Sequence, residues 1–137
     1  MEIRPYSHYE EFEILPLYKA VGWRNYYEHP EMLRRAYENS LCVLGAYEEE
    51  TLVGILRAVG DGASILFVQD IIVHPLHQRN GIGTKLMQAM LERYAHVYQI
   101  QLMTDDTEKT KAFYRSVGFC TMQEIGCAGF VKFGTPL

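Results

Sequence analysis

One stretch of this chain constrains the fold most: an apolar run that passes through a glycine-bearing loop into an amphipathic helix. Residues 65–73 are apolar at nearly every position, as expected of a strand covered on both faces. The loop that follows ends in Gln78-Arg79-Asn80-Gly81-Ile82-Gly83, and apolar residues then recur at steps of three and four. The pattern predicts a strand joined to a helix through a polar turn.

A loop of this kind can hold a phosphate group. The first N–H groups of a helix have no intrahelical partner, and the helix dipole adds partial positive charge there. Gly81 and Gly83 carry no Cβ atom that would keep a phosphate away, and Arg79 adds a cation. The same glycines could also serve only to turn the chain, because short glycine motifs are not specific.

Spacing excludes two well-known nucleotide loops. A dinucleotide fingerprint needs a third glycine where this chain has Leu86. A P-loop needs Gly-Lys-Ser/Thr, whereas the order here is Gly83-Thr84-Lys85. Neither motif fits the sequence.

The length and pattern predict one α/β domain over residues 1–137. Apolar runs at 41–47, 51–59 and 64–73 have short connectors, which favours an antiparallel meander. A helix at 82–95 then crosses over to a strand at 98–103, which we expect to lie parallel to strand 64–73. The remaining expected elements are a strand at 1–6, a helix that Ser7 caps and Gly22 stops, a helix from Pro30, a helix at 107–117 that Asp105 caps and Gly118 stops, and two short strands within 119–133.

Composition excludes several functions. The net charge of −4, without a basic run, argues against a nucleic-acid partner. No apolar stretch reaches the about 20 residues of a membrane span, and no signal-peptide pattern is present, so we expect a cytoplasmic protein. Three cysteines without Cys-x-x-Cys spacing indicate free thiols. His74 and His77 lack further ligands at suitable spacing, so no metal site is predicted.

A second motif lies near the end of the last predicted helix, where Phe113-Tyr114 is followed by Gly118-Phe119. A tyrosine hydroxyl, with an ordinary pKa of about 10, can protonate a thiolate leaving group. Tyr114 could equally be a half-buried packing residue when considered alone.

Together the loop at 78–83 and the Phe-Tyr-x-x-x-Gly-Phe run at 113–119 resemble the two signatures of the GCN5-related N-acetyltransferases, the GNAT superfamily. The resemblance covers nearly the whole chain. It implies the acyl-CoA N-acyltransferase fold, a mixed and mostly antiparallel sheet flanked by helices, with one parallel strand pair that splays apart. Val21-Gly22-Trp23, the turn at 59–62 and Asp70 are similar to the bacterial and plant aralkylamine (serotonin-type) branch.

The resemblance implies direct transfer of an acetyl group from acetyl-CoA to a primary amine, without a nucleophilic cysteine or a metal. Tyr114 would protonate the departing CoA thiolate. Thr107 stands where the family often has an asparagine that contacts CoA. The residues implied in cofactor binding are Ile71, Ile72, Val73, Gln78, Arg79, Asn80, Gly81, Ile82, Gly83, Thr84, Thr107 and Tyr114.

The attacking amine must also lose a proton. Asp70 is the only carboxylate of its strand, and Gln69 stands where polyamine-type relatives carry Glu. A carboxylate in an apolar strand needs a partner, because unpaired burial is costly. Asp70 would either bind or deprotonate the amine, or accept structural hydrogen bonds from loop N–H groups. Trp23, Tyr26 and Gln69 are the expected walls of the acceptor pocket.

A small aralkyl- or alkylamine is the expected substrate. One alternative is acetylation of a protein lysine or N-terminus, and another is a non-catalytic CoA-binding sensor domain. Tyr114 favours catalysis over the sensor. A monomer and a homodimer are both compatible with the composition.

Overall fold

The computed structural model describes residues 1–136, which divide into two units, Met1–Leu102 and Met103–Pro136. The first unit holds the sheet and four α-helices, and the second holds one α-helix and one 3₁₀ turn. Each unit is described by itself.

A five-stranded sheet runs through the first unit in the order β1-β2-β3-β4-β5. β1 to β4 pair antiparallel with their neighbours, whereas β4 and β5 run parallel, as the crossover helix requires. The predicted meander, the crossover and the mixed GNAT-type sheet are therefore confirmed. The strands are β1 (Glu2–Pro5), β2 (Cys42–Glu48), β3 (Thr51–Gly60), β4 (Ile65–Val73) and β5 (Gln99–Leu102).

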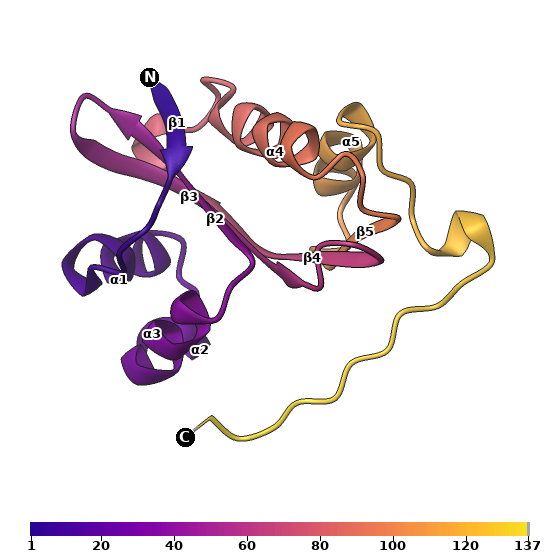
Figure 1. Cartoon of the computed structure of the whole chain (residues 1–137), viewed down its shortest axis with the longest axis horizontal. Coiled ribbons are helices and arrows are strands. Elements are labelled where there is room, and N and C mark those ends of the chain that lie inside the picture. The colour runs from indigo at the N-terminus through magenta and orange to yellow at the C-terminus, as the bar shows by residue number, and fades with distance from the viewer. Residues whose placement is uncertain (137) are drawn as a thin grey trace. The chain divides into compact units, whose positions relative to one another are not determined.

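Helices cover both faces of this sheet (Figure 1). On one face lie α1 (Glu11–Ala20), the single-turn α2 (Arg24–Tyr27) and α3 (Pro30–Glu38), and on the other lies α4 (Ile82–Arg93). The apolar stripe of α4 is buried, and on the opposite face α1 and α3 pack with β3 and β4 into one core. A fully buried aliphatic side chain of this kind contributes about 1.5–3 kcal/mol.

The start of α1 differs from the predicted Ser7 capping box, which is wrong. The helix begins at Glu11, and no side chain caps it. The Tyr6 hydroxyl instead accepts the N–H of Glu10 at 3.1 Å, so a tyrosine directly after β1 takes the role expected of a serine. The predicted stop at Gly22, with φ +74°, and the start of α3 at Pro30 are confirmed. The short α2 was not predicted.

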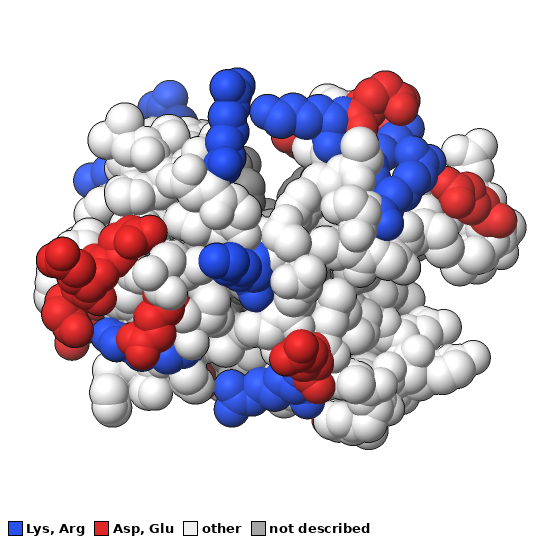
Figure 2. Space-filling model, turned by 90° about the horizontal axis from the view of Figure 1, so that it is seen from above, with Lys and Arg blue, Asp and Glu red and all other residues white. Residues whose placement is uncertain are grey.

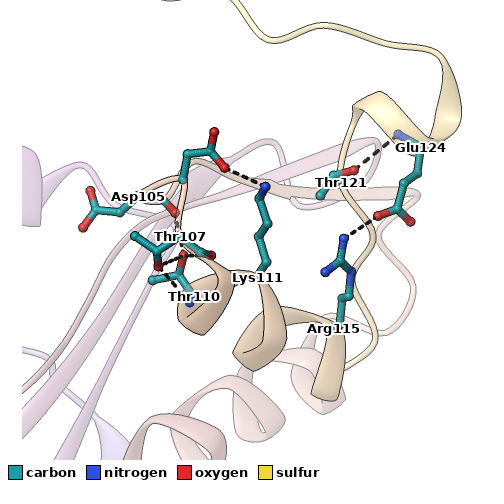
Figure 3. A network of polar contacts seen from close by, with 8 residues as sticks. Asp105, Thr107, Thr110, Lys111, Arg115, Thr121 and Glu124 are labelled. Atoms are coloured by element: carbon teal, nitrogen blue, oxygen red, sulfur yellow. Dashed lines mark hydrogen bonds and ion pairs between the residues drawn. The ribbon is translucent and has the colours of Figure 1, made fainter.

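The second unit is built around α5 (Glu108–Ser116) (Figure 3). Thr107 caps the helix, because its Oγ1 accepts the N–H of Thr110 at 3.1 Å. The predicted Asp105 cap is wrong, since Asp105 offers its carbonyl oxygen to the Thr110 hydroxyl instead. Two ion pairs hold the unit together, Lys111 to Asp106 at 2.7 Å and Arg115 to Glu124 at 2.8 Å.

The two strands predicted within 119–133 are also wrong. The described part of this segment contains only the 3₁₀ turn η2 (Gln123–Ile125), which ends at Gly126 with φ +79°. A strand needs a hydrogen-bonding neighbour, and the second unit has no strand in its described residues to provide one. Phe130 and Phe133 are accordingly 97% and 82% exposed.

Charge is mixed over the molecular face shown in Figure 2, where basic and acidic side chains both occur and neither sign covers the surface. No α-helix of the described residues is long and apolar enough to cross a membrane.

Candidate functional site

The parallel strands β4 and β5 stay together for only part of their length. The last paired residues are Val68 and Leu102, whereas β4 continues to Val73. From Gln69 onward, the edge of β4 that β5 would have covered has no strand beside it in the described chain. Residues 71–73, which the family resemblance implies in cofactor binding, lie on this open part of β4.

The register between β3 and β4 shifts at the same place. Arg57 is opposite Asp70, but the next residue of β3, Ala58, is opposite Val68. Gln69 is therefore an extra residue without a partner on β3, which makes it a β-bulge. Its side-chain amide donates to the Tyr26 hydroxyl at 2.9 Å, so α2 contacts the bulge directly.

The loop after β4 folds back on the strand through its side chains. Gln78 donates its amide to the carbonyl oxygen of Val73 at 3.0 Å, after the short η1 turn (Pro75–His77). Arg79 and Gly81 both have positive φ, at 70° and 75°. Arginine in this region is uncommon, and strain of about 1–3 kcal/mol at a non-glycine residue is a feature of functional loops.

The N-terminus of α4 is uncapped. Gly81 is the N-cap residue and offers no side-chain acceptor. In the described residues, no acceptor lies within hydrogen-bonding distance of the N–H groups of Ile82, Gly83 or Thr84. Free N–H groups at the positive end of a helix, with the exposed side chain of Arg79 nearby in sequence, make a suitable site for a diphosphate.

Asp70 lies in the core at 2% exposure rather than in the loop. Its Oδ2 accepts from the Tyr18 hydroxyl at 2.7 Å and from Nε of Arg57 at 2.8 Å, and Tyr18 in turn contacts the hydroxyl of Tyr37 at 2.9 Å. The donors to Asp70 are therefore side chains of α1 and β3, not the loop N–H groups considered above. Its Oδ1 has no hydrogen-bond partner in the described chain.

Burial and charge act together on this cluster. Burial lowers the pKa of Arg57, but Asp70, Tyr18 and Tyr37 together outweigh this effect, so the pKa is raised and the guanidinium stays charged. Burial, followed by the neighbouring Tyr37 and Asp70, raises the pKa of Tyr18 far above its ordinary value. Tyr18 therefore acts as a hydrogen-bond donor, not as an anion.

The three predicted pocket residues lie close to this cluster. Ring centroids of Trp23 and Tyr26 are 6.1 Å apart, and each also lies near the ring of Tyr18, at 6.0 and 5.5 Å. Gln69 joins the group through Tyr26. Sequence reasoning missed Tyr18 and Arg57, although a charged Arg57 in an apolar strand was the same kind of signal as Asp70.

Tyr114 belongs to the second unit, on α5. Its ring packs edge-on against Phe113 and Phe119, with centroids 4.9 and 6.0 Å away. Burial raises the pKa of Tyr114, and a hydrogen bond with the side chain of Thr104 opposes this shift. The phenol therefore stays protonated at neutral pH. The hydroxyl of Thr107 is engaged in capping α5.

A cavity of about 290 Å³ lies beside the cluster and shares Tyr37 with it. Tyr37, Ser40, Cys42, Arg93 and Tyr94 are among its lining residues, and none of the predicted site residues is. Burial raises the pKa of Cys42, which keeps the thiol protonated and a poor nucleophile. Among residues 1–136, no three His, Cys, Asp or Glu side chains are grouped to hold a metal ion.

Three comparisons place this geometry among known proteins. Residues 6–119 match the model of the Acetyltransferase (GNAT) family. A solved GNAT family acetyltransferase from Streptococcus pneumoniae TIGR4 is 41% identical, with a TM-score of 0.88 and 97% of each chain covered. A GNAT family acetyltransferase from Brucella melitensis, solved in complex with acetyl-CoA, is 22% identical with a TM-score of 0.67, covering 88% of this chain and 82% of that one. The second structure shows likeness of fold alone.

Among curated proteins, an uncharacterized N-acetyltransferase (ycf52-like) from Prochlorococcus marinus is 26% identical over 113 residues. The match covers 78% of this chain and 61% of that relative. The chain thus spans about three fifths of the length of this curated relative.

Proposed function

The chain belongs to the acetyltransferase (GNAT) family, and from that premise we propose that it transfers the acetyl group of acetyl-CoA to a small primary amine. The proposal depends on two features that follow one another in the chain, the open edge of β4 and the uncapped N-terminus of α4. A thioester cofactor that carries a diphosphate beyond its amide-containing arm needs these two kinds of backbone contact.

Each part of the cofactor has a group suited to it. The amide-containing pantetheine arm would add to residues 71–73 as a further strand does, through main-chain hydrogen bonds. The pyrophosphate would accept from the N–H groups of residues 79–84, with Arg79 adding charge. That the Brucella melitensis protein of the same fold was solved with acetyl-CoA supports this choice of cofactor.

The reaction needs proton transfer at two atoms, the nitrogen and the sulfur. The neutral amine attacks the carbonyl carbon of the thioester, the C–N bond forms, and the C–S bond breaks to release the CoA thiolate. We assign the protonation of that thiolate to Tyr114, on the sequence motif of α5 and on the raised pKa of its phenol. The amine loses its protons to solvent, one from the bound ammonium form before the attack and one from the nitrogen after it.

We assign Asp70 to the amine itself. The Tyr18 hydroxyl and Nε of Arg57 donate to its Oδ2, and the carboxylate is the counter-charge that we assign to the ammonium form of the amine. Its Oδ1 is buried and has no hydrogen-bond partner in the described chain, and the ammonium group would supply the missing donor. The rings of Trp23 and Tyr26 nearby favour an aralkylamine, as in the serotonin-type branch, over a purely polar amine.

The free thiols of the chain support a proposed location in the cytoplasm. Cys42, Cys120 and Cys127 are all free, which fits a reducing cytoplasm. The cytoplasmic location and the single-domain organisation of the chain are part of the proposal.

Release of free thiol from acetyl-CoA tests the proposal, with 2-phenylethylamine, tryptamine, spermidine and a lysine-containing peptide as acceptors. We expect amine-dependent release that is fastest with the two aralkylamines, and the acetylated amine in the mass spectrum. Asp70→Asn should raise the KM for the amine about tenfold or more, because the counter-charge is lost. Acetyl-CoA binding without turnover on any amine would favour the sensor domain, and turnover of the peptide alone would overturn the substrate class.

A further inference from the structure

We infer that the buried Arg57–Asp70 ion pair is a positioning device: it fixes the β-bulge at Gln69 and thereby sets the backbone edge on which acetyl-CoA binds. The inference rests on the proposed function, since it concerns the same binding edge. It assigns a role to Arg57 and Tyr18, to which the reaction itself gives no part.

The location of the pair is the first observation. Arg57 and Asp70 face each other across β3 and β4, and the register shifts at the next residue of β3. On the other side of β4, pairing with β5 ends at Val68. The ion pair therefore lies immediately beside the bulge, where the sheet also opens.

Side chains from three elements bind Asp70 and its neighbour Gln69. Tyr18 of α1 and Arg57 of β3 both donate to Asp70, and Tyr26 of α2 accepts from Gln69. Arg57 also reaches the Ser40 hydroxyl at 3.3 Å. Side chains of α1, α2 and β3 therefore stabilise the bulge, in addition to the backbone pairing of the strands.

The apolar surroundings of the Arg57–Asp70 ion pair argue against a role in stability alone. Arg57 and Asp70 are 5% and 2% exposed, in a face otherwise packed with apolar side chains such as Ile55 and Ile72. Two well-packed apolar residues are often as stable as a buried ion pair, or more so, because neither must be desolvated. Specifying one register among alternatives is the best-attested reason to keep such a pair.

Register matters here because side chains alternate across a strand. With the bulge present, Asp70 and Ile72 face the α1–α3 core, while residues 71 and 73 point to the other face. A regular ladder without the extra residue would send this set to the opposite faces. It would also turn the backbone groups of residues 69–73, and the proposed cofactor edge would be lost.

The test uses the double variant Arg57→Leu/Asp70→Leu, with acetyl-CoA affinity measured by calorimetry in the absence of any amine. We expect the Kd for acetyl-CoA to rise at least tenfold while the Tm stays equal to or above that of the wild type. Leu33→Ala is the matched control, because Leu33 is fully buried in the same core but lies on α3 and not on either strand of the pair. It should lower the Tm and leave the Kd unchanged.

A double variant that folds and binds acetyl-CoA with wild-type affinity would overturn the inference. Tyr18→Phe provides a milder arm, since it removes one donor to Asp70 and keeps the ring: a smaller rise in Kd supports the inference, and no change counts against it. Amide hydrogen exchange over residues 66–73 reads the bulge without any ligand. If wild-type protein bound no acetyl-CoA, the proposed function would fail, but faster exchange in the double variant would still support the role of the pair at the bulge.

Discussion

Two glycines with the same backbone conformation provide a matched test of the proposed phosphate loop. Gly22 and Gly81 have φ of +74° and +75°, and at both a Cβ atom would meet nothing within 4 Å. Alanine at either position therefore strains the backbone equally, by about 1–2 kcal/mol. We expect Gly81→Ala also to raise the Kd for acetyl-CoA about tenfold, because strain there moves the N–H groups that meet the pyrophosphate. Calorimetry and thermal unfolding measure both effects, and an equal Kd for Gly22→Ala and Gly81→Ala would contradict the assignment.

Tyr114 is tested by its pH dependence. A general acid works in its protonated form, and burial raises the pKa of this phenol above its ordinary value of about 10. Wild-type kcat should therefore show no loss from this group as the pH rises to about 10. Tyr114→Phe should lower kcat by about 10²-fold or more across that range.

The control for this variant is Tyr98→Phe, which removes a hydroxyl from a side chain that is 82% exposed. It should leave kcat unchanged. Full turnover by Tyr114→Phe at every pH would show that another group or solvent protonates the thiolate.

At the scale of single residues, the sequence pointed to the candidate loop and to Asp70, but it did not predict the residues that contact Asp70. Gly81, Arg79 and Asp70 stand out because each breaks a local pattern. Tyr18 does not, since a tyrosine in an amphipathic helix is ordinary, and its bond to Asp70 joins residues 52 positions apart. The bulge at Gln69 is defined by the pairing of β4 with β3, so no local pattern predicts it.

Among the elements, β3 packs closely against the first turn of α4 at Gly54, where the candidate phosphate site begins. A Cβ atom at Gly54 would lie 3.1 Å from the carbonyl oxygen of Ile72 and 3.3 Å from Cγ2 of Ile82. Gly54→Ala should therefore displace the start of α4, lower stability by about 1–3 kcal/mol and weaken acetyl-CoA binding.

Gly45→Ala is the control for that element. A Cβ atom there would lie 2.9 Å from side-chain atoms of Leu52 and Tyr47, so it also overfills the core, but none of its three nearest atoms belongs to α4. The free energy of unfolding and the Kd for acetyl-CoA measure the two effects. A loss of stability in both variants with unchanged affinity in both would mean that the packing of α4 does not tune the site.

The elements that the sequence predicted well are those that a local pattern defines. The strands β2, β3 and β4 and the helix α4 each carry a full apolar pattern, and their order left one parallel crossover. The wrong predictions concern two helix caps and the strands expected near the end of the chain. The Tyr6 hydroxyl replaces a cap at α1, and Thr107 is a better placed acceptor than Asp105 at α5. The apolar residues after Gly126 resemble strands, but strand formation depends on a neighbour.

At the scale of the whole chain, we propose that the cofactor and the amine bind on two sides of one bulge. The Oδ2 atom of Asp70 accepts from Arg57 beside the bulge, and its buried Oδ1 has no partner in the described chain. The cavity beside Cys42 has no part in this account. The central claim is therefore that acetyl-CoA binds along the open edge of β4 and at the start of α4.

Mapping amide chemical shifts during titration with acetyl-CoA tests that claim most directly. The account predicts that the largest shifts occur at residues 71–73 and 79–84, and that amides lining the cavity, such as those of Ser40 and Cys42, change little. Shifts confined to the cavity, or a saturated complex in which the amides of residues 79–84 do not move, would contradict it.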